Sequence, residues 1–323
     1  MAEITCREAL NQAMHEEMAR DDRIFILGED VGLYEGSFKV TKGLLARFGD
    51  RRVVDTPISE AGIVGLACGA AMIGLRPIAE LMTVNFSIVA MDQIMNHVAV
   101  ARYMFGGRVK VPLVIRAPGG AGHQLGAQHS HSLEPIFLHC PGLRVIVPSV
   151  PADAKGLLKS AIRSDDPIMF LEHEGIYGVK GEVPDGDYTI PLGVADIKRP
   201  GGDVTLITLS RMVYVCLEAA KQLAAAGIEA EVVDLRGLNP LDMVTVLDSV
   251  RKTRRAITVE ESWLTGGWGG EVAARIMEEA FDSLDAPVLR VGCADVPMPY
   301  NKKLEKAAIP DVARVIARVR EIV

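Results

Sequence analysis

The chain has 323 residues, of which 49% are hydrophobic and 24% charged, and its formal net charge at pH 7 is −7. This composition is typical of a globular protein of about two domains. The negative charge gives no electrostatic basis for binding nucleic acid or an anionic membrane. No apolar stretch reaches about 18 residues without a polar interruption, so we predict no membrane-spanning helix.

Residues 1–10 lack the basic and then apolar pattern of a secretory signal. The five cysteines include no C-x-x-C pair, and an odd number cannot all pair within one chain. This pattern indicates a reducing compartment and argues against structural zinc, so we expect a cytoplasmic location.

Helical and strand patterns alternate through the first part of the chain. Helices are predicted at 5–20, 61–73, 87–103 and 151–163, and strands at 23–27, 52–55, 77–82, 111–116, 143–147 and 168–171. Thr5, with Glu8 three residues later, predicts a capping box at the first helix. Strands separated by helices imply a parallel sheet covered on both faces.

Residues 176–202 break this alternation, because Gly, Pro and charged residues dominate there. We predict a linker in this segment. A second alternating series follows, with strands at 203–209, 229–234, 256–260 and 288–291 and helices at 213–226, 243–251, 270–281 and 312–322. The predicted fold class is therefore α/β, with two tandem domains at 1–175 and 203–323 and mainly parallel sheets.

The glycine-rich segment after the strand at 111–116 partly matches a dinucleotide-binding fingerprint through Gly120, Gly122 and Gly126. Its last spacing is one residue too long, and no helix pattern follows directly. A nicotinamide-dependent oxidoreductase stays open as an alternative of a different class. His129 and His131 have a spacing that suits a metal, but no third ligand lies at a supporting distance.

Three segments at strand ends carry most of the chemistry: 55–71, 80–94 and 126–132. On spacing alone, Glu60 could be an acid that complements a helix dipole. By the same criterion, Phe86 could be a core residue and His129 an ordinary loop histidine. Their combination is more specific than any one of them.

These segments resemble the beta subunits of two-subunit 2-oxo acid dehydrogenase decarboxylases, a family that includes the pyruvate, branched-chain oxo acid and acetoin enzymes. The resemblance covers essentially the whole chain and includes the stretches 27–32, 36–44, 139–149, 153–163 and 294–305. It implies a transketolase-like pyrimidine-binding domain followed by a domain of the transketolase C-terminal type.

The family motif T-P-I-S-E matches residues 56–60 without change. The resemblance implies that Glu60 hydrogen-bonds the aminopyrimidine ring of thiamine diphosphate and acts as the proton-relay acid. Phe86 would pack on the pyrimidine face. We expect burial among Ile58, Met82 and Phe86 to favour the protonated carboxyl group.

The resemblance implies two further sites. His129, in the family's A-Q-H-S position, would assist proton transfer or reductive acylation of a lipoyl group. Backbone carbonyls would hold a potassium ion, although some relatives carry an acid where Ser164 stands here. The expected potassium ligands are Leu113, Ala161, Ile162, Ser164 and Asp166.

The G-D-G segment with which thiamine enzymes bind Mg²⁺ and the diphosphate does not occur in this sequence. We therefore expect a separate alpha subunit to supply that half of the site, in an alpha2-beta2 heterotetramer. The predicted function is the beta subunit of a pyruvate dehydrogenase, which passes an acyl group to a lipoyl domain of a dihydrolipoyl acyltransferase core. The acetoin and branched-chain enzymes stay open, because the alpha chain helps to shape the substrate pocket.

Overall fold

The computed structural model describes residues 1–323. The chain forms two compact units. Unit 1 contains residues 1–119 and 136–192, and unit 2 contains residues 120–135 and 193–323. A short part of the N-terminal half, 120–135, thus belongs to unit 2, which the predicted domain boundaries did not anticipate.

The centre of unit 1 is a parallel sheet, as predicted. Its strands run in the order β6-β7-β5-β4-β2-β3, and each neighbouring pair is parallel. The bounds are β2 (Ile24–Gly28), β3 (Val53–Asp55), β4 (Arg76–Glu80), β5 (Val114–Gly119), β6 (Arg144–Ile146) and β7 (Ile168–His173). The carboxyl ends of these strands meet at one edge of the sheet, where ligands of open α/β sheets bind.

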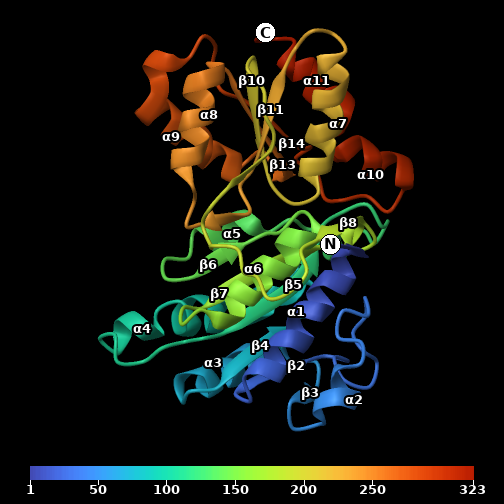
Figure 1. The fold of residues 1–323 in the computed structure, drawn as a ribbon, viewed down its shortest axis with the longest axis vertical. Coiled ribbons are helices and arrows are strands. Elements are labelled where there is room, and N and C mark those ends of the chain that lie inside the picture. Colours follow the sequence, from blue (N-terminus) through green and yellow to red (C-terminus); the bar gives the residue numbers. More distant parts are fainter. The chain divides into compact units, whose positions relative to one another are not determined.

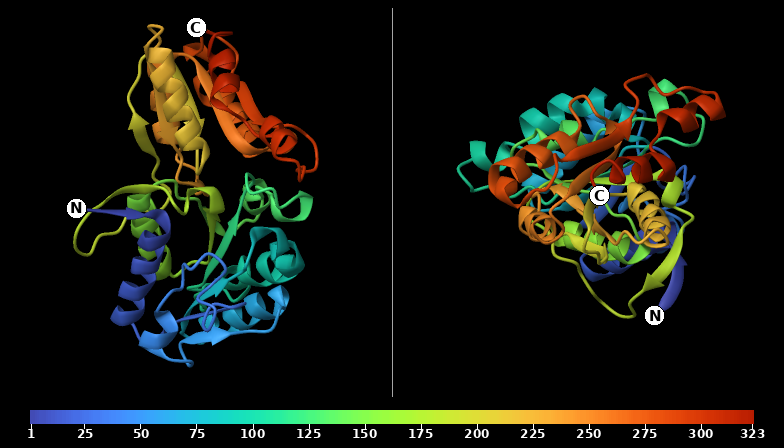
Figure 2. Two further views of the ribbon diagram at one scale, coloured as in Figure 1. Left: turned by 90° about the vertical axis from the view of Figure 1, so that its right-hand side faces the viewer. Right: turned by 90° about the horizontal axis from the view of Figure 1, so that it is seen from above.

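Helices cover both faces of this sheet (Figures 1 and 2). Helices α1 and α6 lie side by side on one face, and α3 lies on the other. The α-helices are α1 (Cys6–Arg20), α2 (Leu44–Phe48), α3 (Glu60–Met72), α4 (Ala101–Met104), α5 (Glu134–Leu138) and α6 (Pro151–Arg163), and a 3₁₀ turn, η4 (Glu174–Ile176), follows β7. The predicted capping box of α1 is confirmed, because the side chain of Thr5 accepts from the Glu8 backbone and the side chain of Glu8 accepts from the Thr5 backbone.

The prediction of a single helix at 87–103 is wrong. The structure has a 3₁₀ helix η1 (Val84–Ala90), a π-helix η2 (Gln93–Val98) and the short α4. Polar side chains near the start compete with the regular helical pattern: Asn85 Nδ2 donates to Thr83 Oγ1 and Ser87 Oγ donates to the carbonyl of Val84.

The segment predicted as a linker contains two strands. Strand β8 (Lys180–Val183) pairs antiparallel with β1 (Ala2–Thr5) in unit 1. Strand β9 (Asp196–Arg199) pairs antiparallel with β11 (Ala230–Asp234) in unit 2. Seven of the eight residues in these two strands are half-buried or exposed. Their sequences therefore contain no run of apolar residues, and they resemble the sequence of a linker.

Unit 2 contains a second α/β sheet, with strand order β14-β13-β10-β11-β9. All pairings except that of β9 are parallel. Helices α7 and α11 cover one face, and α8 and α9 cover the other (Figure 1). The remaining elements are β10 (Val204–Thr208), β12 (Gly237–Asn239), β13 (Ala256–Trp263), β14 (Leu289–Cys293), α7 (Met212–Ala224), α8 (Met243–Thr253), α9 (Trp268–Ala280), α10 (Lys302–Ala308), α11 (Val312–Val319), η3 (Ala127–His129) and η5 (Phe281–Ser283).

The predicted fold class, two α/β parts with mainly parallel sheets, is confirmed. Each unit has its own apolar core between sheet and helices. None of the helices combines the length and the apolar character that crossing a bilayer requires.

Candidate functional site

Glu60 is the first residue of α3 and follows the turn that leaves β3. Its side chain is buried, with 8% exposure, although it is acidic. Burying a carboxyl group costs free energy unless the group is paired, hydrogen-bonded or protonated. No hydrogen bond from the N-cap Ser59 side chain closes this helix end. Glu60 therefore occupies the carboxyl edge of the unit 1 sheet as a buried acid.

Glu29 is a second buried acid at this edge, and the sequence analysis did not identify it. It directly follows β2, which is hydrogen-bonded to β3, and it is 7% exposed. Its Oε1 atom is buried without a hydrogen-bond partner. Burial, followed by the charges of Glu60 and Asp30, raises the pKa of Glu29. The signal was present in the string L-G-E-D at a strand end, where parallel sheets place ligands.

The apolar residues expected around Glu60 are more open than predicted. Ile58 is 81% exposed and Phe86 is 37% exposed, while Met82 is half-buried. This chain alone therefore does not enclose Glu60 with Ile58 and Phe86. The reason is local: Ile58 lies in the turn before α3, and Phe86 lies on the outer 3₁₀ helix η1.

The outer face of α3 is uncharged. Leu66 is 60% exposed and lies one turn after Gly62, and both residues and Gly69 are open to solvent. A Cβ atom added to Gly69 would meet nothing within 4 Å. Ile73, just beyond the helix, is 82% exposed. An exposed apolar surface of this kind, next to a buried acid, is typical of a surface that another protein covers.

His129 lies in the short helix η3 of unit 2 and is exposed. His131 is half-buried, and its ring meets the ring of Trp263 edge-on with 5.6 Å between centroids. Burial and the nearby His129 lower the pKa of His131. Glu60 belongs to unit 1 and the His129 loop to unit 2.

Carboxylates already hold the backbone of the glycine-rich loop before His129. The N–H of Ala121 donates to Glu261 Oε1 at 2.7 Å, and the N–H groups of Gly122 and Gln124 donate to Glu305 Oε1 at 3.0 Å. A dinucleotide fingerprint needs free backbone N–H groups that face a pyrophosphate. Here the carboxyl groups of Glu261 and Glu305 occupy the position of the pyrophosphate and would repel it. The structure therefore disfavours nicotinamide binding by this loop.

Three of the five expected potassium ligands, Ile162, Ser164 and Asp166, already have cationic partners. Arg76 donates to the carbonyl oxygen of Ile162 from Nε at 3.0 Å and Nη2 at 2.9 Å, and also to that of Ser164. The side chain of Asp166 pairs with Arg102 and Arg144. Guanidinium groups thus supply the positive charge at this place, and the residues fit an additional cation poorly.

Leu113 and Ala161, the other two expected potassium ligands, have carbonyl oxygens that accept backbone N–H groups. The carbonyl of Leu113 accepts from Ile168 at 2.9 Å, and that of Ala161 accepts from Ser164 at 3.1 Å. No group of three or more His, Cys, Asp or Glu side chains in the chain is arranged to hold a metal ion.

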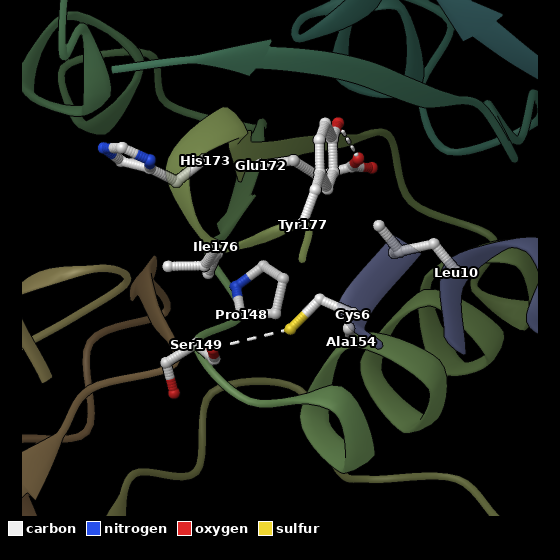
Figure 3. A pocket seen from close by; sticks show the side chains of 9 residues that line it. All are labelled: Cys6, Leu10, Pro148, Ser149, Ala154, Glu172, His173, Ile176 and Tyr177. Carbon is white, nitrogen blue, oxygen red and sulfur yellow. Dashed lines mark hydrogen bonds between the residues drawn. The ribbon is translucent and has the colours of Figure 1, made fainter. Parts of the chain in front are cut away.

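A small cavity in unit 1 lies beside α1 and β7 (Figure 3). Its volume of about 10 Å³ is near the lower limit for one water molecule, so it is too small for a substrate. Cys6 lines it with its thiol 3.9 Å from the carbonyl oxygen of Ser149, and burial raises the pKa of this thiol to about 12. The thiol is therefore protonated and chemically inert at neutral pH.

Comparisons with known proteins agree on the family of both units. The chain matches the family "Transketolase, pyrimidine binding domain" over residues 2–180 and "Transketolase, C-terminal domain" over residues 193–315. It is 51% identical to the mitochondrial pyruvate dehydrogenase E1 component subunit beta of Caenorhabditis elegans, over 98% of this chain and 92% of that protein. It is 49% identical to the corresponding subunit of Rhizobium meliloti (strain 1021), over 100% of this chain and 70% of that protein.

A solved structure extends this likeness to the fold. The chain is similar to a split gene transketolase described as an inactive beta4 tetramer, with a TM-score of 0.81 and 28% sequence identity. The similarity covers 99% of this chain and 98% of the transketolase.

Proposed function

Because the chain belongs to the family of pyruvate dehydrogenase E1 beta subunits, we propose that it binds the aminopyrimidine end of thiamine diphosphate and works with an alpha subunit in the oxidative decarboxylation of pyruvate. Acetoin and branched-chain oxo acids are the alternative substrates. When bound, thiamine diphosphate supplies the carbon nucleophile and the electron sink that decarboxylation requires.

The observation that carries this proposal is the buried acid at the carboxyl edge of the unit 1 sheet. Glu60 is 8% exposed, and its charge contributes to the raised pKa of Glu29. A buried carboxyl group at this edge can form a hydrogen bond with a ring nitrogen of the pyrimidine. Glu60 would hold the pyrimidine in this way, and Phe86 and Ile58 offer apolar surface for its ring.

The exposed apolar surface supports a partner subunit next to Glu60. Ile58, Phe86, Leu66 and Ile73 are all more than a third exposed in the single chain. A covering alpha subunit would bury them and supply the groups that bind Mg²⁺ and the diphosphate. The proposed assembly is an alpha2-beta2 heterotetramer.

His129 is proposed to act in the second half of the reaction. It is exposed, so a bulky acceptor can reach it, and imidazole can transfer protons near neutral pH. We assign it to reductive acylation of a lipoyl group, which is carried by a lipoyl domain of a dihydrolipoyl acyltransferase core. All five cysteines are unpaired and buried, which supports a reducing compartment such as the cytoplasm.

The test is the variant Glu60→Gln, co-expressed with the alpha subunit. Glutamine keeps the size of the side chain but cannot exchange the proton, so we expect pyruvate decarboxylation with a dye acceptor to fall by at least ~100-fold. The matched control is Glu278→Gln, which changes an exposed glutamate of α9. Near wild-type activity of an intact Glu60→Gln complex would contradict the proposal.

The same assay, run with acetoin and branched-chain oxo acids, decides the substrate. The alternative function, a nicotinamide-dependent oxidoreductase, is tested by measuring the binding of nicotinamide dinucleotide to the chain. We expect none, because the loop N–H groups are already bonded to Glu261 and Glu305.

A further inference from the structure

The stretch 294–305 has no role in the function proposed so far, although it is among the most specific parts of the sequence. In unit 2 it contacts the loop 120–132, which carries His129. We propose that Glu305 is a positioning residue, which holds this loop in the shape that His129 needs for acyl transfer. The inference rests on the proposed function of His129.

Glu305 lies in the first turn of α10 and is 2% exposed. Its carboxylate accepts three hydrogen bonds from the loop. Oε1 accepts the backbone N–H groups of Gly122 and Gln124, each at 3.0 Å, and Oε2 accepts the Nε2 group of Gln124 at 2.5 Å. These bonds join residues more than 180 positions apart in the sequence, so they define tertiary structure rather than a local turn.

The position of Glu305 is itself fixed. The side chain of Asn301 accepts the N–H groups of Lys303 and Leu304 at 3.0 and 3.3 Å and so caps α10. The cap fixes where α10 begins, and so it fixes the position of Glu305 in the first turn of the helix. Gln124 has a positive φ of 57°, a strained conformation for a residue other than glycine, and its two bonds to Glu305 stabilise it.

The far end of the loop packs closely on the same stretch. Gly126 has a φ of +80°, and a Cβ atom there would lie 2.4 Å from the ring of Tyr300. The carbonyl of Gly126 accepts the N–H of His129 at 3.3 Å. The loop is thus held at Gly122 and Gln124 by Glu305 and at Gly126 by Tyr300, immediately before the turn that carries His129.

The arrangement needs an acceptor at both carboxyl oxygens of Glu305. An ionised carboxylate is an acceptor only, and it can take all three N–H groups. A glutamine in its place would put an NH2 group where one carboxyl oxygen now accepts. That NH2 group would face either the backbone N–H groups of Gly122 and Gln124 or the side-chain NH2 of Gln124, and neither can accept a hydrogen bond. The loop would then shift, and a displacement of about 1 Å at a reacting group can cost on the order of 100-fold in rate.

The experiment uses the co-expressed complex and two assays, the dye-coupled decarboxylation and the acylation of a free lipoyl domain. The variants are Glu305→Gln, His129→Ala and the double variant, with Glu278→Gln as the control. We expect Glu305→Gln to lower the ratio of acylation to dye-coupled rate by about 10-fold. We expect the double variant to be no slower than His129→Ala, because residues that act as a unit are not additive.

Two results would overturn the inference: an unchanged ratio in Glu305→Gln, or a double variant whose loss is the product of the single losses. If His129→Ala itself leaves acylation unchanged, then the proposed role of His129 fails. If His129→Ala is slow but Glu305→Gln is not, then only the positioning role fails. A purely structural effect of Glu305 would lower both assays equally and would also contradict the inference.

Hydrogen exchange gives a readout that is independent of activity. Glu305→Gln should speed exchange in peptides from 120–131 and leave peptides from α7 unchanged. Gly126→Ala keeps the carboxylate but places alanine at a φ of +80°, which strains the loop backbone whatever the Tyr300 ring does, and it should reproduce the selective loss of acylation. If Glu305→Gln does not assemble with the alpha subunit, Gly126→Ala tests the inference in its place. A normal ratio of acylation to dye-coupled rate in Gly126→Ala would then overturn the inference.

Discussion

Arg116 is a fully buried cation, 1% exposed, in the middle of the unit 1 sheet. It donates to Glu172 from Nε at 2.7 Å and from Nη2 at 2.8 Å, and it pairs with Glu80 through Nη1. Tyr177 donates to Glu172 at 2.6 Å, as Figure 3 shows. Burial raises the pKa of Glu80 even though Arg116 opposes this. The network links β4, β5 and β7 at the edge that carries Glu60.

Replacing Arg116 by methionine should destabilise unit 1 strongly. The change leaves two buried carboxyl groups without their cation, which typically costs about 3–5 kcal/mol. Urea unfolding followed by tyrosine fluorescence or circular dichroism measures this. Arg275→Met is the matched control, because Arg275 pairs only at the surface with Glu279. Equal midpoints for the two variants would show that the buried network contributes little.

At the residue scale, the sequence can suggest a candidate residue where a short motif carries it, but not where distant segments meet. Glu60 and His129 each lie in a recognisable string. Glu29 has only its place after a strand, and its relation to Glu60 depends on β2 and β3 being neighbours in the sheet. Glu305 could not be connected to the His129 loop, because their contact spans nearly the whole of unit 2 in sequence.

At the scale of elements, β13 and α9 enclose a buried acid in unit 2. Glu260 has no exposed surface, and it accepts from Ser262 Oγ at 2.5 Å and from the N–H of Gly269 at 3.3 Å. Burial is the main reason that the pKa of Glu260 rises to about 7. The folded chain therefore keeps this proton in a pH range where the unfolded chain has already lost it.

This difference predicts that Glu260→Gln increases the stability of the folded chain, and that the increase grows with pH. An unfolded glutamate titrates near 4.3, roughly. Stability contributed by the neutral group is thus fully present below that pH and is lost as pH rises towards 7. The variant should raise the melting temperature more at pH 8 than at pH 5, by an amount equivalent to at most about 3 kcal/mol. Glu278→Gln is the control, and a pH-independent difference for Glu260→Gln would contradict the assignment.

Most elements followed from periodicity and caps. The amphipathic helix α1 begins at its predicted capping box, and the alternating strands of both units were found at nearly the predicted places. The failures have physical causes. The region expected to be one helix at 87–103 is divided into 3₁₀, π and α segments, and local polar bonds of Asn85 and Ser87 lie at its start. Strands β8 and β9 lack the buried apolar pattern that would have distinguished them from a linker.

At the scale of the whole molecule, the uncharged face of α3 predicts how the chain assembles. A glutamate at Leu66 would place a charge in a surface that the proposed partner subunit buries, and burying an unpaired charge is costly. We expect Leu66→Glu to fold normally but to elute as a smaller species than the alpha2-beta2 complex in size-exclusion chromatography. Met277→Glu, on an exposed part of α9, is the control. A normal tetramer for Leu66→Glu would mean that another surface forms the interface.

The central claim concerns the contact between Glu60 and thiamine diphosphate, and a crystal structure of the alpha-beta complex with the cofactor tests it most directly. Our account predicts the Glu60 carboxyl group within hydrogen-bonding distance of a pyrimidine ring nitrogen, with water excluded and the diphosphate bound by the alpha subunit. A Glu60 side chain that faces solvent, with the pyrimidine held elsewhere, would contradict it.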